Sequence, residues 1–443
     1  MFSVMKKIKT KNMKRLYLLI SLFTISGMTL SAQYQIDYWE NGRKKQEGKL
    51  VNGEPDSVWT YYHANGNKSS EGTYSHGEKT GTWRSWYYNG SPATTMDYRT
   101  GQFQSIYKNG GIECEGTVKN DMREGRWTFY HPNGKISKQC GYLHDSLDGK
   151  CEEFYDNGIK LFEGYYTDNS LIGLGTWWYG NGKIEMQGYS KEGLQDSTWN
   201  FYYANGQLGS TGLFRKGLQE GRWTYYYETG EKWKEGSFAE GKREGKWTAW
   251  FEDGKKQREG SFSNGKENGL WISWYPNGRR EDMGYFCEGK MCMEWKGWYD
   301  NGNQRYTASY ADNQKHGDYI FYWDNGVVNQ RGAFKKGLRS GKWEYFSQQG
   351  NPLESGNYKF GKKDGTWSFY GQRGNLVRTQ SFTSDLPNGK WTEYDAKGEK
   401  IAEGSYRNAA KHGTWTYYDK GQIIQQVTYK NGLKTTETKK NAK

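Results

Sequence analysis

The 443-residue chain is poor in the residues that build ordinary globular cores and helices. Hydrophobic residues make up 34% of it, half of them aromatic (17%), and it has only six prolines. Because aliphatic side chains are scarce, the chain cannot build a large central core. Its buried surface must therefore be aromatic and local. Sixty glycines, with no apolar pattern of period 3.6 residues, exclude a helical protein.

The residue patterns of enzymes and metal sites are also missing. No Cys-x-x-Cys pair, P-loop or dinucleotide-binding glycine motif occurs. None of the six histidines has metal-ligand spacing to another or accompanies a plausible nucleophile; they are His63, His76, His131, His144, His316 and His412. We therefore expect a protein that is not an enzyme and holds no cofactor or metal.

The positive charge is concentrated at the N-terminus. The net charge is +13, but residues 1–32 carry six Lys/Arg and no acid, which leaves 57 basic against 50 acidic residues. These charges are interspersed, without the basic stripe that nucleic-acid binding needs. We expect no nucleic-acid partner. Membrane contact by the remainder has no support in the sequence, and the oligomeric state is left open.

The N-terminus has the pattern of a secretory signal peptide. Lys14 and Arg15 precede an apolar run from Leu16 to Leu30, and Ser31-Ala32-Gln33 follows. The run is short for a membrane span, although an uncleaved anchor is the alternative. Residues 1–32 are thus predicted to be a leader cleaved near Ala32. The mature chain would be exported to the periplasm, the outer-membrane surface or the extracellular space.

The rest of the chain is a repeat of about 24 residues. A tryptophan marks most units, with an Asn-Gly dipeptide about six residues later. We call the tryptophan site position 0. Its 17 occupants are Gln35, Trp59, Trp83, Phe103, Trp127, Cys151, Gly175, Trp199, Trp223, Trp247, Trp271, Trp295, Tyr319, Trp343, Trp367, Trp391 and Trp415. Such a period is typical of a repeat array.

Each unit has the pattern of a β-hairpin. In Gly81-Thr-Trp-Arg-Ser-Trp-Tyr-Tyr-Asn-Gly90, an aromatic residue stands at position 3 and Asn-Gly at positions 6 and 7. This dipeptide predicts a type I′ turn, which needs positive φ at both central residues. A second turn is expected near positions 17–20, as in Glu240–Arg243. The predicted fold is all-β: an elongated, twisted antiparallel meander of about 17 hairpins over residues 33–430, followed by a basic disordered tail over residues 431–443.

Folding about both turns places position 0 opposite position 13 of its own unit and of the preceding one. Position 13 is usually glycine, as at Gly72, Gly116 and Gly236. The register therefore places this glycine between two tryptophan positions, where its missing side chain leaves room for the indole rings.

The cysteines fit this register. Cys140 occupies position 13 and Cys151 the next position 0, so the two are predicted cross-strand neighbours. Cys287 and Cys292 are placed symmetrically about a second-type turn. In an oxidising compartment these pairs are expected to form two disulfides, leaving Cys114 free. The alternative is that all five are small apolar residues.

Positions 0 and 3 have opposite parity, so their aromatic rows should face opposite sides of the sheet. One row is expected to hold the array together and the other to be partly exposed, as a platform for sugar rings, peptide strands or proteins. The alternative is that both rows are packing. The candidate binding residues are Tyr202, Tyr226, Trp250, Trp274, Trp298 and Tyr322.

Units such as Gly221-Arg-Trp-Thr-Tyr-Tyr-Tyr227 and Gly413-Thr-Trp-Thr-Tyr-Tyr418 resemble the MORN-repeat variant family, which in bacteria includes YwqK-type antitoxin-like proteins. The resemblance covers nearly all of residues 34–430. It implies an elongated sheet of hairpins used for protein interaction, scaffolding or lipid contact, and it brings no catalytic residues.

The sequence thus favours an exported, non-enzymatic repeat protein that binds a protein partner or acts as a scaffold at the cell envelope. The first alternative is a binder of cell-wall or other envelope glycans through the position-3 aromatics. The second is an antitoxin-like neutraliser, which would have to remain in the cytosol.

Overall fold

The computed structural model describes residues 16–18 and 31–439. The chain divides into two compact units, residues 1–218 (unit 1) and 219–443 (unit 2). Every regular element in the described ranges is a β-strand. No helix there is long and apolar enough to cross a membrane. The predicted leader lies outside the described residues, apart from a three-residue strand, Leu16–Leu18, and residues 31 and 32.

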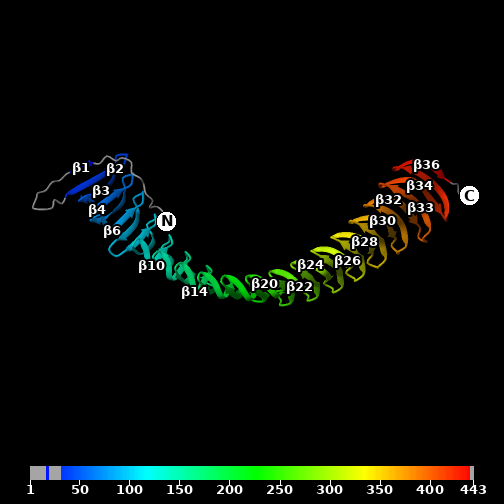
Figure 1. The fold of residues 1–443 in the computed structure, drawn as a ribbon, viewed down its shortest axis with the longest axis horizontal. Helices are drawn as coiled ribbons and strands as arrows, with labels where there is room; N and C mark the ends of the chain where they lie inside the picture. The colour runs from blue at the N-terminus through cyan, green and yellow to red at the C-terminus, as the bar shows by residue number, and fades with distance from the viewer. Residues whose placement is uncertain (1–15, 19–30, 440–443) are drawn as a thin grey trace, which may run out of the picture. The chain divides into compact units, whose positions relative to one another are not determined.

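In unit 1, consecutive strands pair antiparallel in chain order (Figure 1). These strands are β1 (Leu16–Leu18), β2 (Ala32–Tyr38), β3 (Lys44–Val51), β4 (Glu54–Tyr62), β5 (Lys68–Ser75), β6 (Glu78–Trp86), β7 (Pro92–Asp97), β8 (Gln102–Ile106), β9 (Ile112–Lys119), β10 (Met122–Tyr130), β11 (Ile136–Leu143), β12 (Ser146–Phe154), β13 (Lys160–Thr167), β14 (Ser170–Trp178), β15 (Ile184–Lys191), β16 (Leu194–Tyr202) and β17 (Leu208–Arg215).

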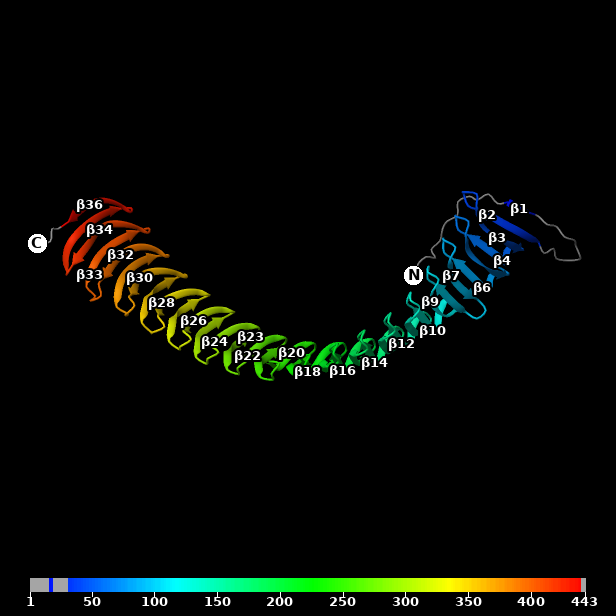
Figure 2. The ribbon, with the colours of Figure 1, turned by 180° about the vertical axis from the view of Figure 1, so that it is seen from behind.

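Unit 2 repeats this arrangement, and its strands also lie side by side in chain order (Figure 2). These strands are β18 (Leu218–Tyr226), β19 (Lys232–Ala239), β20 (Lys242–Trp250), β21 (Lys256–Ser263), β22 (Lys266–Trp274), β23 (Arg280–Cys287), β24 (Lys290–Trp298), β25 (Gln304–Ala311), β26 (Gln314–Tyr322), β27 (Val328–Lys335), β28 (Leu338–Phe346), β29 (Pro352–Lys359), β30 (Lys362–Tyr370), β31 (Leu376–Thr383), β32 (Leu386–Tyr394), β33 (Lys400–Arg407), β34 (Ala410–Asp419), β35 (Gln422–Lys430) and β36 (Leu433–Lys439). The prediction of an all-β antiparallel meander of hairpin repeats is confirmed.

The predicted type I′ conformation of the Asn-Gly turns is wrong. In the turn after β4, the His63 N–H donates to Asn67 O at 2.8 Å and the Gly66 N–H donates to His63 O at 2.9 Å. Gly66 has φ +93°, but Asn65 is not among the residues with positive φ. A hydrogen-bonded turn followed by one left-handed glycine is a type I turn with a G1 bulge.

The type I′ conformation belongs to the second turns instead. Apart from the longer turn between β7 and β8, these turns have two central residues, at positions 17 and 18, and both have positive φ, as in His76 (51°) and Gly77 (80°) or Asn264 (51°) and Gly265 (82°). A two-residue connection needs the I′ twist to match its strands, whereas the longer Asn-Gly connection does not.

A β-bulge precedes position 0 in nearly every unit. In β10 the ladder to β9 is interrupted between Glu124 and Thr128, so that Gly125, Arg126 and Trp127 lie opposite Gly116. Gly125 has φ +67°. The glycine two residues before position 0 is therefore required by left-handed backbone at the bulge.

The C-terminal tail also differs from expectation. Leu433–Lys439 form β36, which pairs antiparallel with β35, so disorder from residue 431 onward is wrong for this segment. A two-residue turn at Asn431 and Gly432, with φ 49° and 83°, returns the chain along β35. Paired backbone therefore orders a segment whose side chains are all exposed.

Candidate binding faces

Each sheet presents two different surfaces. Positions 0, 2, 13 and 15 lie on one side, which we call the tryptophan face. Positions −1, 1, 3, 9 and 12 lie on the other, which we call the glutamate face. Trp223 pairs with Gly236, and Thr224 pairs with Glu235, so that successive cross-strand pairs alternate between the faces.

The tryptophan face is filled by its own side chains. The rings at position 0 are almost fully buried, as for Trp127, Trp343 and Trp367. A Cβ placed on Gly284 would lie 2.0 Å from the Trp295 ring, and nine other position-13 glycines are blocked in the same way at 2.1–2.4 Å. The blocking ring always comes from the following unit, which sharpens the expected position of each glycine between two tryptophans.

Hydrogen bonds and ring contacts fix these indoles further. The Trp295 N–H donates to Tyr285 O at 3.0 Å, and nine other position-0 tryptophans make the same bond at 2.9–3.2 Å. Phe286 packs edge-on against Trp295, with ring centroids 5.1 Å apart. Because these rings are occupied by neighbours, the position-0 row is the packing row of the array.

In six repeat units the glutamate face carries a group of three side chains: a cation at position 9, a glutamate at position 12 and the position-3 aromatic of the next repeat unit. Lys44 Nζ lies 2.8 Å from Glu47 Oε2, and the Tyr62 hydroxyl donates to Glu47 Oε1 at 2.5 Å. Partial burial and the Glu47 carboxylate raise the pKa of Tyr62 to about 12. Tyr130 with Glu115 and Tyr418 with Glu403 repeat the bond at 2.6 Å.

Tryptophan replaces tyrosine at position 3 in three successive units. Trp250, Trp274 and Trp298 each lie beside a cation of the preceding repeat unit, and the position-12 residue of that repeat unit is Glu235, Glu259 and Met283 respectively. Lys232, Lys256 and Arg280 are 5.1, 5.7 and 5.9 Å from the respective ring centroids. All six predicted binding residues are half-buried. Each repeat unit contributes one of them, and they do not converge on a common pocket.

Two open grooves lie along this face in unit 2. One, of about 410 Å³, is lined by Arg222, Glu235, Gly236, Ser237, Lys246, Thr248, Trp250, Lys256 and Glu259. The other, of about 300 Å³, is lined by Arg279, Arg280, Trp298 and Gly302. Each groove therefore contains a position-3 tryptophan and cationic side chains.

Ion pairs organise the larger groove. Arg222 and Lys232 contact Glu235 at 2.7 and 2.9 Å, and Lys246 and Lys256 contact Glu259 at 3.1 and 2.8 Å. Partial burial opposes ionisation of Glu235, but the hydrogen bonds from Arg222 and Lys232 outweigh it and hold its pKa below the usual value.

The sequence analysis missed a row of residues that joins neighbouring units. A donor at position 4 bonds the position-3 carbonyl of the next unit, as from the Tyr227 hydroxyl to Trp250 O and from the Tyr275 hydroxyl to Trp298 O, both at 2.9 Å. The turn asparagine at position 6 makes a similar bond two residues later, to the position-5 carbonyl of the next repeat unit, as from Asn277 Nδ2 to Asp300 O at 2.8 Å. The recurrence of Tyr, His or Trp at position 4 was the available signal.

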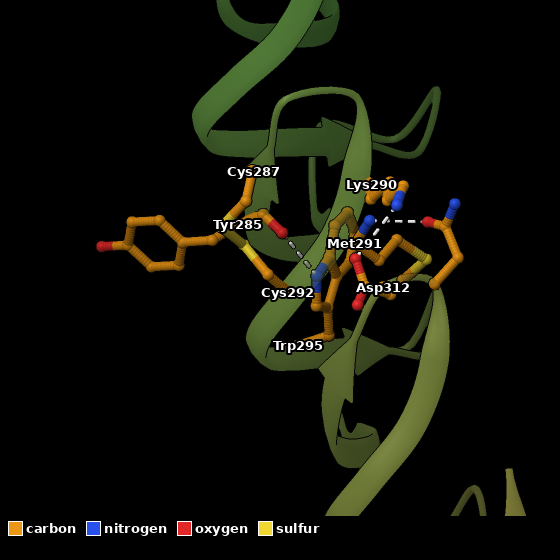
Figure 3. Close-up of a disulfide and its surroundings, with 8 residues drawn as sticks. Tyr285, Cys287, Lys290, Met291, Cys292, Trp295 and Asp312 are labelled. Atoms are coloured by element: carbon orange, nitrogen blue, oxygen red, sulfur yellow. Dashed lines mark hydrogen bonds and ion pairs between the residues drawn. A yellow bond between two sulfur atoms is a disulfide. The ribbon is translucent and has the colours of Figure 1, made fainter. Parts of the chain in front are cut away.

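Disulfides join Cys140 to Cys151 and Cys287 to Cys292, the pairs that the register predicts. Cys140 lies directly opposite Cys151, with Cα atoms 4.0 Å apart, and both are buried. Cys287 and Cys292 are not symmetric about their turn, however. Cys287 pairs with Lys290 and Cys292 with Tyr285, so this disulfide is diagonal (Figure 3).

Cys114 is the remaining, free cysteine. Its sulfur lies 3.0 Å from Ser105 Oγ, and burial raises its thiol pKa. No group of three or more His, Cys, Asp or Glu suited to a metal ion is found between residues 31 and 439.

Likenesses to solved structures reach across most of the chain. A structure described as "Crystal Structure of TcdB2-TccC3-TEV" is 11% identical, with 90% of this chain and 25% of that chain covered and a TM-score of 0.15. "Crystal structure of the eukaryotic initiation factor" is 9% identical, with 85% and 94% covered and a TM-score of 0.15. The chain spans about a quarter of the TcdB2-TccC3 chains. TM-scores this low support no inference.

No curated protein matches the chain in sequence. The model of the MORN repeat variant matches eight segments, residues 55–76, 123–144, 147–168, 219–240, 243–264, 315–336, 387–408 and 411–431. These segments lie in both unit 1 and unit 2. The repeat units between the matched segments share their register and turns. The chain belongs to the MORN repeat variant family.

Proposed function

We propose that this MORN repeat protein is exported and acts without catalysis, as a binding array at the cell envelope that uses the glutamate face. The difference between the two faces carries the proposal. The tryptophan face is occupied by packed rings and their hydrogen bonds, whereas the glutamate face keeps a half-buried aromatic side chain at position 3 of most repeat units, with a cation and a glutamate beside it in six of them. Many modest contacts to one partner would add up through multivalency.

Export is supported by the predicted leader and by the two disulfides, which persist in oxidising compartments. The test is alkylation of thiols in intact cells that express the protein, followed by fractionation. Four cysteines protected from alkylation, in an envelope or secreted fraction without residues 1–32, are expected. An uncleaved cytosolic chain with five reactive cysteines would instead favour an antitoxin-like neutraliser.

The use of the glutamate face is tested by affinity capture from the cell envelope of the source organism. Arg222→Glu/Lys246→Glu reverses two charges of the larger groove and should release the captured partner. The matched control, Lys336→Glu, reverses the charge of an exposed side chain in a two-residue turn. Equal capture by the groove variant and the parent would contradict the assignment of this face.

The two open grooves beside Trp250 and Trp298 favour a second candidate, an envelope glycan as the partner. Indole rings stack on sugar rings, and neighbouring charged groups bond hydroxyls and acidic substituents. Retention on purified cell wall, lost on substitution of Trp250, Trp274 and Trp298, would distinguish this candidate from a protein scaffold.

A further inference from the structure

Trp250, Trp274 and Trp298 form the longest run of tryptophans at position 3. They end β20, β22 and β24, alternate strands of one sheet in unit 2, so successive indoles are separated by two strand spacings, or roughly 9.6 Å before twist. The other two tryptophans at position 3, Trp86 and Trp178, have no tryptophan at position 3 in either adjacent unit.

The charge around this row is positive. Arg222, Lys246 and Lys256 line the larger groove together with two carboxylates, Glu235 and Glu259, and Lys232 also contacts Glu235. At the other end of the row, Arg279 and Arg280 line the second groove with Trp298. The side chains of Arg222 and Lys246 are 69% and 65% exposed. Exposed ion pairs are worth little, so these cations can turn to an incoming anion at small cost.

From this arrangement we infer that the row from Trp250 to Trp298 binds an anionic linear polysaccharide, a polymer of acidic sugars. Sugar rings stack on the indoles, ring carboxylates pair with Arg222, Lys246 and Arg279, and ring hydroxyls donate to Glu235 and Glu259. The inference rests on the proposed function, since it names the ligand class of the glutamate face. The spacing of the indoles corresponds to two sugar residues of an extended chain for each repeat unit.

The carboxylates distinguish this ligand from a single-stranded nucleic acid, the other polymer that combines rings with negative charge. Glu235 and Glu259 alternate with the cations and would repel a phosphate at every nucleotide. Their pKa values lie below the usual value: partial burial opposes ionisation, but the cations that bond them outweigh it, so both are ionised at neutral pH. A sugar polymer carries hydroxyl donors between its anionic groups and can satisfy both signs of charge.

The test measures binding of polygalacturonate oligomers to the disulfide-bonded protein by titration calorimetry. We expect binding that weakens as salt rises, because ion pairs contribute. Trp250→Ala/Trp274→Ala/Trp298→Ala should weaken it at least about ten-fold, since three stacking contacts are lost. Arg222→Gln/Lys246→Gln should weaken binding and flatten its dependence on salt.

The matched control is Trp86→Ala/Trp178→Ala. These residues occupy position 3, and their ring centroids lie 5.8 and 5.6 Å from the Nζ atoms of Lys68 and Lys160. Their substitution removes the same kind of packing but leaves the row from Trp250 to Trp298 unchanged. Control binding should equal that of the parent, and circular dichroism should show that both variants keep their strands.

Several results would overturn the inference. They are the absence of polygalacturonate binding by the parent, an equal loss in the control variant, equal affinity for a neutral linear glucan, and tighter binding of single-stranded DNA. If a protein is captured from the envelope through the glutamate face while polygalacturonate is not bound, the proposed function stands and this ligand class fails.

Discussion

The Cys140–Cys151 disulfide lies on the tryptophan face of unit 1, whereas the Cys287–Cys292 disulfide lies on the glutamate face of unit 2. The first replaces a glycine and a tryptophan in the packing row, and Trp127 and Phe162 join it in one buried cluster. The second leaves the packing row intact, since Gly284 still faces Trp295.

The difference shows two ways of supporting the same hairpin. Around Cys140 the covalent bond fills the space that an indole fills elsewhere. Around Cys287 it ties two strands together where the bulge between Gly284 and Tyr285 interrupts their ladder. One disulfide is therefore part of the core, and the other braces a turn next to exposed Leu270, Tyr285 and Met293.

The largest loss of stability is expected at position 13 near the Cys287–Cys292 disulfide, where the glycine and tryptophan of the packing row are both present. Gly284→Ala places a Cβ 2.0 Å from the Trp295 ring, so the indole must leave its site. The loss should approach that of a buried aromatic, about 4 kcal/mol. Hydrogen exchange of peptides spanning residues 280–298 measures it, because openings in a repeat array are local.

The chain itself provides the control for Gly284→Ala. At the same register position, Ala308 precedes Tyr319, and both are buried. Gly284→Ala/Trp295→Tyr should therefore recover part of the lost protection. Unchanged exchange in Gly284→Ala would show that the close approach to Trp295 does not limit this position.

Removal of the core disulfide ranks second. Cys140→Ala/Cys151→Ala opens a loop of 11 residues, worth about 3 kcal/mol by chain entropy, and leaves a cavity beside Trp127. The measurement is hydrogen exchange over residues 127–162. Cys140→Gly/Cys151→Trp rebuilds the regular pair and should be the more stable variant. If it is the less stable one, the space around Cys151 cannot accept an indole.

Removal of the surface disulfide ranks third. Cys287→Ser/Cys292→Ser opens a loop of five residues, worth about 2 kcal/mol. In the parent, dithiothreitol should reduce this disulfide first, because Cys287 is exposed whereas Cys140 and Cys151 are buried. Timed alkylation and mass spectrometry follow both pairs. Equal rates of reduction would remove the contrast between the two regions.

Sequence reasoning went furthest where one residue type recurs with a steric reason. The pairing of position 13 with position 0 followed from two turns, and the Cys140–Cys151 pair followed from that pairing. The Cys287–Cys292 pair was predicted from symmetry about a turn, although the two residues are diagonal neighbours. The Asn-Gly turns were assigned the wrong conformation because Asn-Gly suits both I′ and G1-bulge turns, and only loop length separates them. The bulge was missed because the sequence shows its glycine, two residues before position 0, but does not show that the strand pairing is interrupted there.

The candidate faces were predictable only in part. Opposite parity placed positions 0 and 3 on opposite sides of the sheet. It did not predict which row is buried, since both rows are aromatic. Burial of position 0 follows from the space above glycine at position 13, and Tyr62, Tyr130 and Tyr418 at position 3 donate instead to a position-12 glutamate. The grooves depend on side-chain directions of Arg222 and Lys246 that no pattern in the sequence reports.

The smallest effect is expected at Met293, two residues before Trp295, where the bulge requires left-handed backbone. Met293 has φ 58°, whereas Gly269 at the same position of the preceding unit has φ 79°. A side chain in this conformation costs about 1 kcal/mol, and glycine loses part of that gain through its freedom in the unfolded chain. Met293→Gly should therefore stabilise residues 285–298 by about 0.5 kcal/mol in hydrogen exchange, and Gly269→Ala should destabilise its own bulge. A destabilising Met293→Gly would mean that the 62% exposed methionine makes contacts that outweigh its backbone strain. If the substitution stabilises the bulge in the reduced protein but not in the oxidised one, the Cys287–Cys292 disulfide is what holds the strained methionine in place.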